Sequence, residues 1–159
     1  MPTIYTTTID SPPGRIILAA TEQGLCGIYF EGQKHMPDHS TWVEDAPRFT
    51  EVTTQLQAYF RGERRTFDLT FFPVHGTAFQ RAVWQALQAI GAGQTCTYGA
   101  LAKQLGKPAA VRAVGAAVGR NPLCIVIPCH RVIGHNGSLT GYAGGLERKQ
   151  WLLRHEGVL

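Results

Sequence analysis

The sequence predicts an α+β protein with two domains, a small N-terminal α/β domain built on an antiparallel sheet and a mainly helical C-terminal domain. The first 73 residues contain short runs rich in apolar and β-branched residues, separated by turn-forming residues. From Thr77 onward, apolar residues recur at helical spacing instead. Residues 1–73 hold six Lys/Arg and nine Asp/Glu, a balance of −3, whereas residues 74–159 hold nine and two, a balance of +7. We therefore place the domain boundary between residues 73 and 74.

Three strands are expected at the start of the chain, over residues 3–9, 15–20 and 25–30, because these runs are rich in Thr, Ile, Leu and aromatic residues. Residues 11–14 and 22–24 separate them with Pro and Gly, which mark turns. Short turns between successive strands favour an antiparallel sheet.

A single helix is expected in the same domain. Residues 49–60 carry apolar side chains at helical spacing and are followed by Gly62, a helix stop signal. The apolar residues are Phe49, Val52, Leu56, Tyr59 and Phe60. We expect residues 32–47 to form a loop and residues 67–72 to form a last strand.

The C-terminal domain begins with a helix start signal. Thr77 and Gln80 have the spacing of a capping box, in which each side chain satisfies a free backbone N–H of the other residue. An apolar stripe at Phe79, Val83, Leu87 and Ile90 follows, and we expect Gly91 to end this helix. Three more helices are expected, over residues 98–105, 109–119 and 146–156.

The composition limits the classes of protein that need to be considered. No stretch of the 159 residues approaches the roughly 20 apolar residues that span a bilayer, and the N-terminus lacks the regions of a signal peptide. We therefore expect a cytoplasmic protein. The four cysteines form no CxxC pair and have no zinc-finger spacing, which favours reduced thiols and no bound metal. A metal held by Cys26 and distant histidines is the alternative.

Residues 98–119 favour nucleic acid as the partner of the basic half. A short helix, the turn Gly106–Pro108 and a second helix have the layout of a helix-turn-helix. The second helix carries only Ala, Gly and Val side chains apart from Arg112, and we expect its Val111, Val114 and Val118 to face the core. A smooth helix with one long cation suits the narrow minor groove. The alternatives are a packing face within a helical domain and an ordinary solvated basic surface.

The candidate nucleophile is Cys129. An apolar run ends at Pro128, and Cys129, His130 and Arg131 follow together. The thiolate is the nucleophilic form of cysteine, and cations such as Arg131 and protonated His130 would lower a thiol pKa from its free value of about 8.5. Adjacent side chains in a strand point to opposite faces, so either the chain turns at Pro128 or a water bridges the thiol and the imidazole. A buried cysteine at a strand end is the alternative.

Two further features follow the cysteine. Residues 134–145 form a glycine-rich loop whose backbone could approach a flat polar ligand, or they form an ordinary flexible connection. Glu156 falls in the last turn of the final predicted helix, where a carboxylate opposes the helix dipole. It is either a solvated acid beside Arg154 or the group that orients His130 in a Cys-His-Glu relay.

These residues resemble the O6-alkylguanine-DNA alkyltransferases (methylated-DNA–protein-cysteine methyltransferases), of the bacterial type. The active-site signature is matched by the run from Pro128 to Val132. The other matching stretches are residues 77–80, 98–99, 112–115, 121–122, 144–145 and 151–157. The resemblance covers nearly all of the second half, whereas the first half matches loosely, at residues 11–14 and 22–25.

The resemblance implies a fold and an activity. The N-terminal domain would be an RNase H-like roll, and the C-terminal domain would be a winged-helix-like DNA-binding domain. The protein would repair DNA by irreversible, single-turnover transfer of the alkyl group from a flipped-out O6-alkylguanine to Cys129, without a cofactor. O4-alkylthymine is a second candidate substrate. We expect a monomer in solution that binds double-stranded DNA, and we leave open whether it binds cooperatively.

The resemblance also implies roles for particular residues. His130 would take the Cys129 proton through a water, with Glu156 behind it and Asn121 tying down the segment before the cysteine. Arg112 would fill the space left by the flipped base, and Tyr98 would help to rotate the nucleotide. The expected DNA contacts are Tyr98, Gly99, Lys107, Arg112 and His135. The expected base pocket consists of Tyr98, Cys129, Val132, Tyr142 and Ala143.

Some positions depart from the family pattern. Thr21 and Cys26 stand near where some animal members carry zinc ligands, so we expect no zinc requirement. Cys124 replaces a frequent Pro beside the active-site run, which could alter the pocket. Two other classes were considered, a lesion-binding protein without transfer activity and a helix-turn-helix transcription regulator. The presence of Cys129 disfavours the first, and the short chain disfavours the second.

Overall fold

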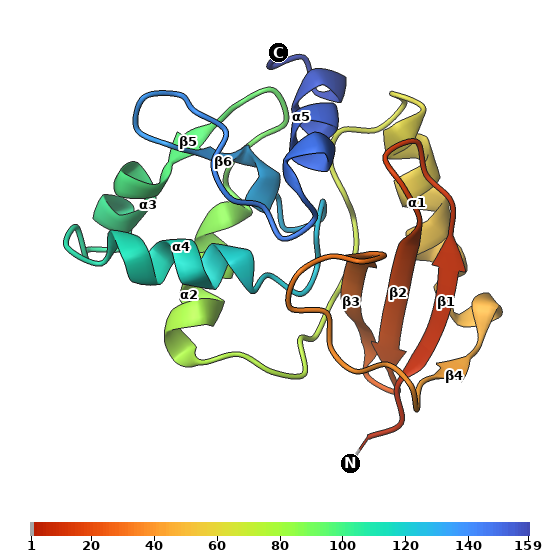
Figure 1. Cartoon of the computed structure of the whole chain (residues 1–159). Coiled ribbons are helices and arrows are strands. Elements are labelled where there is room, and N and C mark those ends of the chain that lie inside the picture. Colours follow the sequence, from red (N-terminus) through yellow and green to blue (C-terminus); the bar gives the residue numbers. More distant parts are fainter. Residues whose placement is uncertain (1) are drawn as a thin grey trace.

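A four-stranded sheet forms the N-terminal part of the computed structural model, which describes residues 2–159. The strands are β1 (Tyr5–Ile9), β2 (Ile16–Thr21), β3 (Gly24–Phe30) and β4 (Val43–Glu44), in the order β3-β2-β1-β4 (Figure 1). The three predicted strands are confirmed, and both of their pairings are antiparallel.

Two expectations about this domain were wrong. Residues 32–47 are not all loop, because β4 pairs in parallel with β1 and makes the sheet mixed. Both β4 residues are exposed, so no apolar alternation marks this strand in the sequence. Residues 67–72 do not form a strand, apart from one isolated bridge between Phe71 and Leu25. The backbone of Asp68 bonds instead to the Gln55 side chain, at 2.9 and 3.0 Å.

One helix covers the sheet. The short 3-10 helix η1 (Ala46–Phe49) leads into α1 (Thr50–Phe60), so the predicted Phe49 start lies at the junction of the two. Val52, Leu56 and Tyr59 are buried on the sheet side, as their spacing predicts. They pack in the same core as β2 and β3 residues such as Leu18 and Phe30.

The C-terminal half is mainly helical. It contains α2 (Ala78–Leu87), α3 (Tyr98–Gln104), α4 (Val111–Gly119) and α5 (Leu146–His155). The predicted capping box is present in full at the start of α2. This helix ends three residues before the predicted Ile90, because residues 88–90 donate to carbonyls three residues back instead of four.

A short parallel pair joins two distant segments of this half. The strands β5 (Cys96–Thr97) and β6 (Val132–Ile133) pair with each other, and neither was predicted. They place the start of α3 beside the residues that follow Cys129. In Figure 1, α3, α4 and α2 lie on the side of the molecule away from the sheet.

The two halves share one hydrophobic core. It includes Phe30 and Leu56 from the N-terminal half together with Leu87, Val114 and Leu152 from the C-terminal half. The free edge of β3 also bonds to the segment before Cys129, because Ile28 N–H donates to the Pro122 carbonyl and Cys124 N–H donates to the Ile28 carbonyl. The N-terminal sheet therefore supports the approach to the candidate nucleophile.

Candidate active site and nucleic-acid interface

The chain turns at the candidate nucleophile. Cys129–Arg131 form the 3-10 turn η2 directly after Pro128. Of the two geometries that the sequence left open, the structure adopts the turn, so the alternation of a strand does not apply here. Cys129 is 5% exposed, and His130 is completely buried. A substrate can therefore reach the Cys129 thiol only through a cavity beside it.

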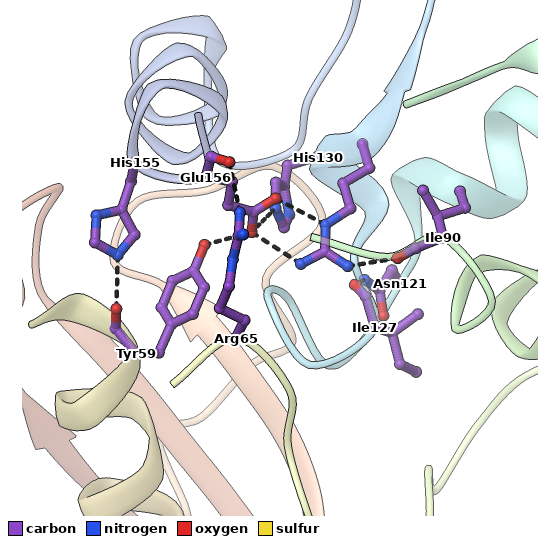
Figure 2. A network of polar contacts seen from close by, with 9 residues as sticks. Tyr59, Arg65, Ile90, Asn121, Ile127, His130, His155 and Glu156 are labelled. Atoms are coloured by element: carbon purple, nitrogen blue, oxygen red, sulfur yellow. Dashed lines mark hydrogen bonds and ion pairs between the residues drawn. The ribbon is translucent and has the colours of Figure 1, made fainter. Parts of the chain in front are cut away.

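Glu156 lies at the centre of a buried polar network (Figure 2). His130 Nε2 lies 2.8 Å from Glu156 Oε2. Arg131 donates to both carboxylate oxygens, from Nε to Oε1 at 2.8 Å and from Nη2 to Oε2 at 2.9 Å. Glu156 is 4% exposed, so it is not a solvated acid beside Arg154. The structure brings together the imidazole and the carboxylate that the sequence could not place side by side.

The network keeps the carboxylate ionised and the imidazole neutral. Burial acts to raise the pKa of Glu156, but hydrogen bonds from His130 and Arg131 outweigh it and hold that pKa far below its ordinary value. Burial lowers the pKa of His130, although Glu156 acts in the opposite direction. A carboxylate can only accept, so His130 Nε2 carries the proton. His130 Nδ1 is then an acceptor, and it has no hydrogen-bond partner among the protein groups of residues 2–159.

Arg131 does not activate the thiol, contrary to expectation. Its guanidinium bonds to Glu156 and to the Ile90 carbonyl, and it is not among the groups that act on the Cys129 pKa. Burial raises the pKa of the Cys129 thiol, and the groups that act to lower it are Asn121, Lys149 and Tyr142. Since the pKa of His130 is lowered as well, it supplies no standing positive charge beside the thiol. The thiol and imidazole are therefore both favoured in their neutral forms.

Asn121 fixes the loop that leads to the cysteine. Its amide nitrogen donates to the Ile127 carbonyl at 2.7 Å, and its oxygen accepts from Leu123 N–H at 2.9 Å. Between these contacts, Ile125 adopts a φ of 73°, a left-handed conformation that is costly for a β-branched residue. The side chain therefore holds residues 121–127 in a shape that the backbone alone would disfavour.

A cavity of about 320 Å³ lies between α3, α4 and the glycine-rich loop. Tyr98, Tyr142 and Ala143 of the expected base pocket line it, together with Gly115 and Gly119 of α4. Cys129 and Val132 are buried and are not part of its wall. Burial raises the pKa of both tyrosines, and the charge of a Cys129 thiolate would raise each further.

Lys149 is a buried residue that sequence reasoning missed. Its ammonium donates to the carbonyls of Val132 at 2.6 Å, Thr140 at 2.9 Å and Gly141 at 3.3 Å. Burial lowers the pKa of Lys149 to about 8. Lys149, Leu152, Leu153 and Glu156 recur at helical spacing on the buried face of α5. A lysine on an otherwise apolar stripe was the available signal.

The expected DNA contacts lie at the starts of α3 and α4 and in nearby loops, where three are exposed and Tyr98 and Gly99 are half-buried. Arg112 and Lys107 are exposed at the start of α4 and in the turn before it, and His135 is exposed in the loop after β6. Tyr98 and Gly99 begin α3, where the Tyr98 hydroxyl donates to the Thr140 carbonyl at 3.3 Å.

The structure corrects one detail of the helix that carries Arg112. Val111 is 40% exposed and does not face the core, because it occupies the first position of α4, beyond the packed part of the helix. Ala117 is buried instead, beside Val114 and Val118. The small residues Gly115 and Gly119 line the cavity, so the smooth face predicted for this helix borders the candidate pocket.

Comparison with known proteins agrees with this arrangement. The family model described as the 6-O-methylguanine DNA methyltransferase DNA-binding domain matches residues 78–158, and the model of the ribonuclease-like domain of the same family matches residues 4–73. Fold and family models thus define a two-domain protein with a DNA-binding domain, in which the candidate nucleophile Cys129 precedes a buried His–Glu pair. The chain belongs to the 6-O-methylguanine DNA methyltransferase family, and its N-terminal domain is the ribonuclease-like one that the resemblance implied.

Full-length relatives and a solved structure are similar over nearly the whole chain. A methylated-DNA–protein-cysteine methyltransferase of Methanosarcina acetivorans is 50% identical over 97% of this chain and 99% of the relative. A protein of the same name from Mycolicibacterium paratuberculosis is 48% identical over 94% of this chain and 90% of its own length. The crystal structure of Mycobacterium tuberculosis OGT in complex with DNA has a TM-score of 0.92 and 45% identity, covering 96% of this chain and 93% of that one. Within residues 2–159, no helix is both long and apolar enough to cross a membrane.

Proposed function

We propose that this protein repairs DNA by moving the alkyl group of O6-alkylguanine onto Cys129, in a reaction that occurs once per molecule. The observation that carries the proposal is the turn η2, which holds Cys129 directly before the buried His130–Glu156 pair. This turn lies in the part of the chain that matches the family's DNA-binding domain. The similar proteins named above are methylated-DNA–protein-cysteine methyltransferases, which supports the same activity here. O4-alkylthymine is a further candidate substrate.

The bond changes require no cofactor. The thiolate sulfur attacks the alkyl carbon attached to O6, a carbon–sulfur bond forms, and the carbon–oxygen bond breaks. Guanine leaves with the electron pair of that bond and gains the proton that the thiol gave up. A thioether is not hydrolysed in water, so the modified protein does not return to its starting state.

The proton leaves the thiol toward His130. The free Nδ1 is the acceptor, and a bridging water would carry the proton between it and the sulfur. The imidazolium that forms is stabilised by Glu156 at 2.8 Å. Because both partners start neutral, the thiolate forms only as the reaction proceeds. This agrees with the raised pKa of Cys129 and the lowered pKa of His130.

The cavity beside α4 is the proposed base pocket. A flat purine entering it would meet the Ala143 N–H, a donor suited to O6, and the Tyr98 hydroxyl, which would turn its proton from the Thr140 carbonyl to the base. The carbonyls of Cys129 and Val132 are the proposed acceptors. Tyr142 would close one side of the pocket. Lys149 already donates to the Val132 carbonyl, which leaves that oxygen one lone pair for the base.

We propose that α4 enters the minor groove of double-stranded DNA. Arg112 is exposed at its start and makes no hydrogen bond or ion pair with the other described residues, so it is free to occupy the space of the flipped base. Lys107 and His135 are the proposed phosphate contacts at the edges of this surface, and Tyr98 and Gly99 are the proposed contacts beside the flipped nucleotide. We also propose that the protein acts as a monomer, in the cytoplasm, with residues 73 and 74 at the domain boundary.

The test is the intact mass of the protein after mixing with a duplex that carries a single O6-methylguanine. We expect one methyl group per protein molecule, on the peptide that contains Cys129, and no second turnover with excess DNA. The Cys129→Ala variant should bind the duplex without gaining mass. A wild-type protein that binds the lesion but gains no methyl group would instead be a lesion-binding protein.

A further inference from the structure

Tyr59 connects the N-terminal domain to the proposed proton relay. It lies in the next-to-last position of α1, is 1% exposed, and packs its ring against Phe60, Phe67 and His155. Its hydroxyl donates to Glu156 Oε2 at 2.6 Å, across 97 residues of sequence. Burial and the Glu156 charge raise the pKa of Tyr59, so the phenol stays protonated and remains a donor. A donor is what an ionised carboxylate requires.

Two further contacts bind the same end of α5 to the N-terminal domain. His155 Nε2 donates to the Tyr59 carbonyl at 2.6 Å, and Arg65 Nη2 donates to the Glu156 carbonyl at 2.7 Å (Figure 2). Both of these bonds end on backbone carbonyls. The Tyr59 hydroxyl is the contact that reaches the carboxylate itself, on the oxygen that also faces His130.

We propose that Tyr59 is a positioning residue of the alkyl transfer. Its hydroxyl orients the Glu156 carboxylate toward His130 and reduces the negative charge on Oε2. The N-terminal domain would therefore take part in the chemistry and not only support the fold. This inference rests on the proposed function, because it assigns Tyr59 to the relay that activates Cys129.

The charged and titratable groups around Glu156 determine the direction of the effect. They are Tyr59 from α1, Arg65 from the loop after it, His130 and Arg131 from η2, and His155 on α5 itself. Lys149, about two turns before Glu156 on α5, also acts on His130 and lowers its pKa. Oε2 accepts from Tyr59, His130 and Arg131 at once. Removing the phenol hydroxyl leaves more negative charge on this oxygen, which favours the protonated imidazole and raises the pKa of His130.

The test is the pH dependence of Cys129 alkylation in the Tyr59→Phe variant, which keeps the ring and removes only the hydroxyl. The rate would be measured with O6-methylguanine duplex and, separately, with iodoacetamide, read out by mass on the Cys129 peptide. We expect the acid limb of both profiles to move upward by about half a pH unit or more, because His130 accepts a proton only when neutral. On the acid limb itself, well below the pKa of His130, rates should fall about threefold or more. Tyr5→Phe is the matched control, since the Tyr5 hydroxyl bonds to exposed Glu22, and its profile should match the wild type.

A merely structural role of Tyr59 would scale the rate by the same factor at every pH, and an unshifted acid limb would overturn the inference. Replacement of Tyr59 by 3-fluorotyrosine gives an independent test if the Phe variant folds poorly. A more acidic phenol is a stronger donor, so it should move the acid limb to lower pH, opposite to Phe. The two ideas can fail separately. If Tyr59→Phe shifts the iodoacetamide profile but the wild-type protein takes no methyl group from DNA, the relay is supported and only the proposed function is refuted.

Discussion

The Glu156 carboxylate stays ionised inside the protein, although carboxylates are rarely buried without a partner. It has its partners because α5 ends beside η2, where Arg131 meets both oxygens and His130 meets one. Replacing one partner of a buried pair leaves the other charge uncompensated and costs about 3–5 kcal/mol. At the residue scale, the same contacts that orient His130 therefore also stabilise the fold.

This coupling predicts a loss of stability in acid. The pKa of Glu156 is lowered in the folded protein, so its stabilising contribution is complete above its ordinary value of 4.5 and is lost as the pH falls toward the folded value. His130 acts in the same direction, because its folded pKa lies below 6.5 and the unfolded chain takes up the proton first. Urea unfolding from pH 7 down to pH 3 should show stability falling below about pH 6 and more steeply below 4.5.

The Glu156→Gln variant distinguishes the two contributions. It should be less stable at pH 7 and lose little more stability below pH 4.5, whereas Glu147→Gln, on the exposed face of α5, should behave as the wild type. A Glu156→Gln protein that keeps the full acid dependence would contradict this assignment.

At the scale of elements, β6 and the glycine-rich loop are held by a side chain from α5. Lys149 joins Val132, Thr140 and Gly141 through its ammonium group, and Thr140 and Gly141 line the proposed base pocket. The loop needs such a tie because its own sequence, with five glycines between residues 134 and 145, has little intrinsic order.

The lowered pKa of Lys149 predicts an alkaline effect. Between its folded value of about 8 and its ordinary 10.5, the unfolded chain holds the proton that the folded protein has lost, so this group adds stability as the pH rises. The Lys149→Met variant should lack this gain, which amounts to a few kcal/mol at most, at about 1.4 kcal/mol per pKa unit. Lys103→Met, exposed on α3, is the control. A wild-type-to-variant difference that stays constant from pH 8 to 10 would refute the prediction.

Arg112 allows the proposed role of α4 to be tested separately from the chemistry. The Arg112→Ala variant should transfer methyl groups from duplex DNA about tenfold more slowly or worse, because unstacking a base costs a few kcal/mol that the arginine would offset. Its Cys129 should still react with iodoacetamide at the wild-type rate. Arg154→Ala, which removes the same charge from the exposed side of α5, should leave both rates unchanged. Equal losses in the two variants would indicate a general charge effect.

At the scale of the whole molecule, the charges are divided between the two domains, with −3 on residues 1–73 and +7 on residues 74–159. A basic domain attracts DNA by releasing counterions, and the acidic domain limits where DNA can lie. The shared core and the bonds between β3 and residues 122–124 keep the two parts together. The basic surface is therefore presented in a fixed orientation.

This charge distribution predicts a strong salt dependence of DNA binding. Raising salt from about 50 to 200 mM should weaken binding to a duplex roughly 10- to 100-fold, the range for about two to four phosphate contacts. The rate of iodoacetamide labelling of Cys129 should stay constant over the same range. Fluorescence anisotropy with a labelled duplex measures the first quantity, and an affinity that does not change with salt would count against the proposed interface.

Local patterns in the sequence were sufficient for the three long strands, α1, the α2 capping box and the helix pair around Arg112. The alternation of apolar residues and the turn residues act over a few positions, so their signal does not need the rest of the chain. The motif around Cys129 and its resemblance to a family likewise suggested Cys129, His130 and Glu156 as a relay, and the folded chain places the last two 2.8 Å apart. Only the folded chain showed that β4 joins the sheet and that the Gln55 side chain bonds to the Asp68 backbone where a strand was expected. It also showed that Arg131 bonds to Glu156. The polar partners of Tyr59 and Lys149 also came only from the folded chain, since they lie 97 residues away or on loop carbonyls. Helical spacing shows which face of a helix is buried, but not what that face contacts.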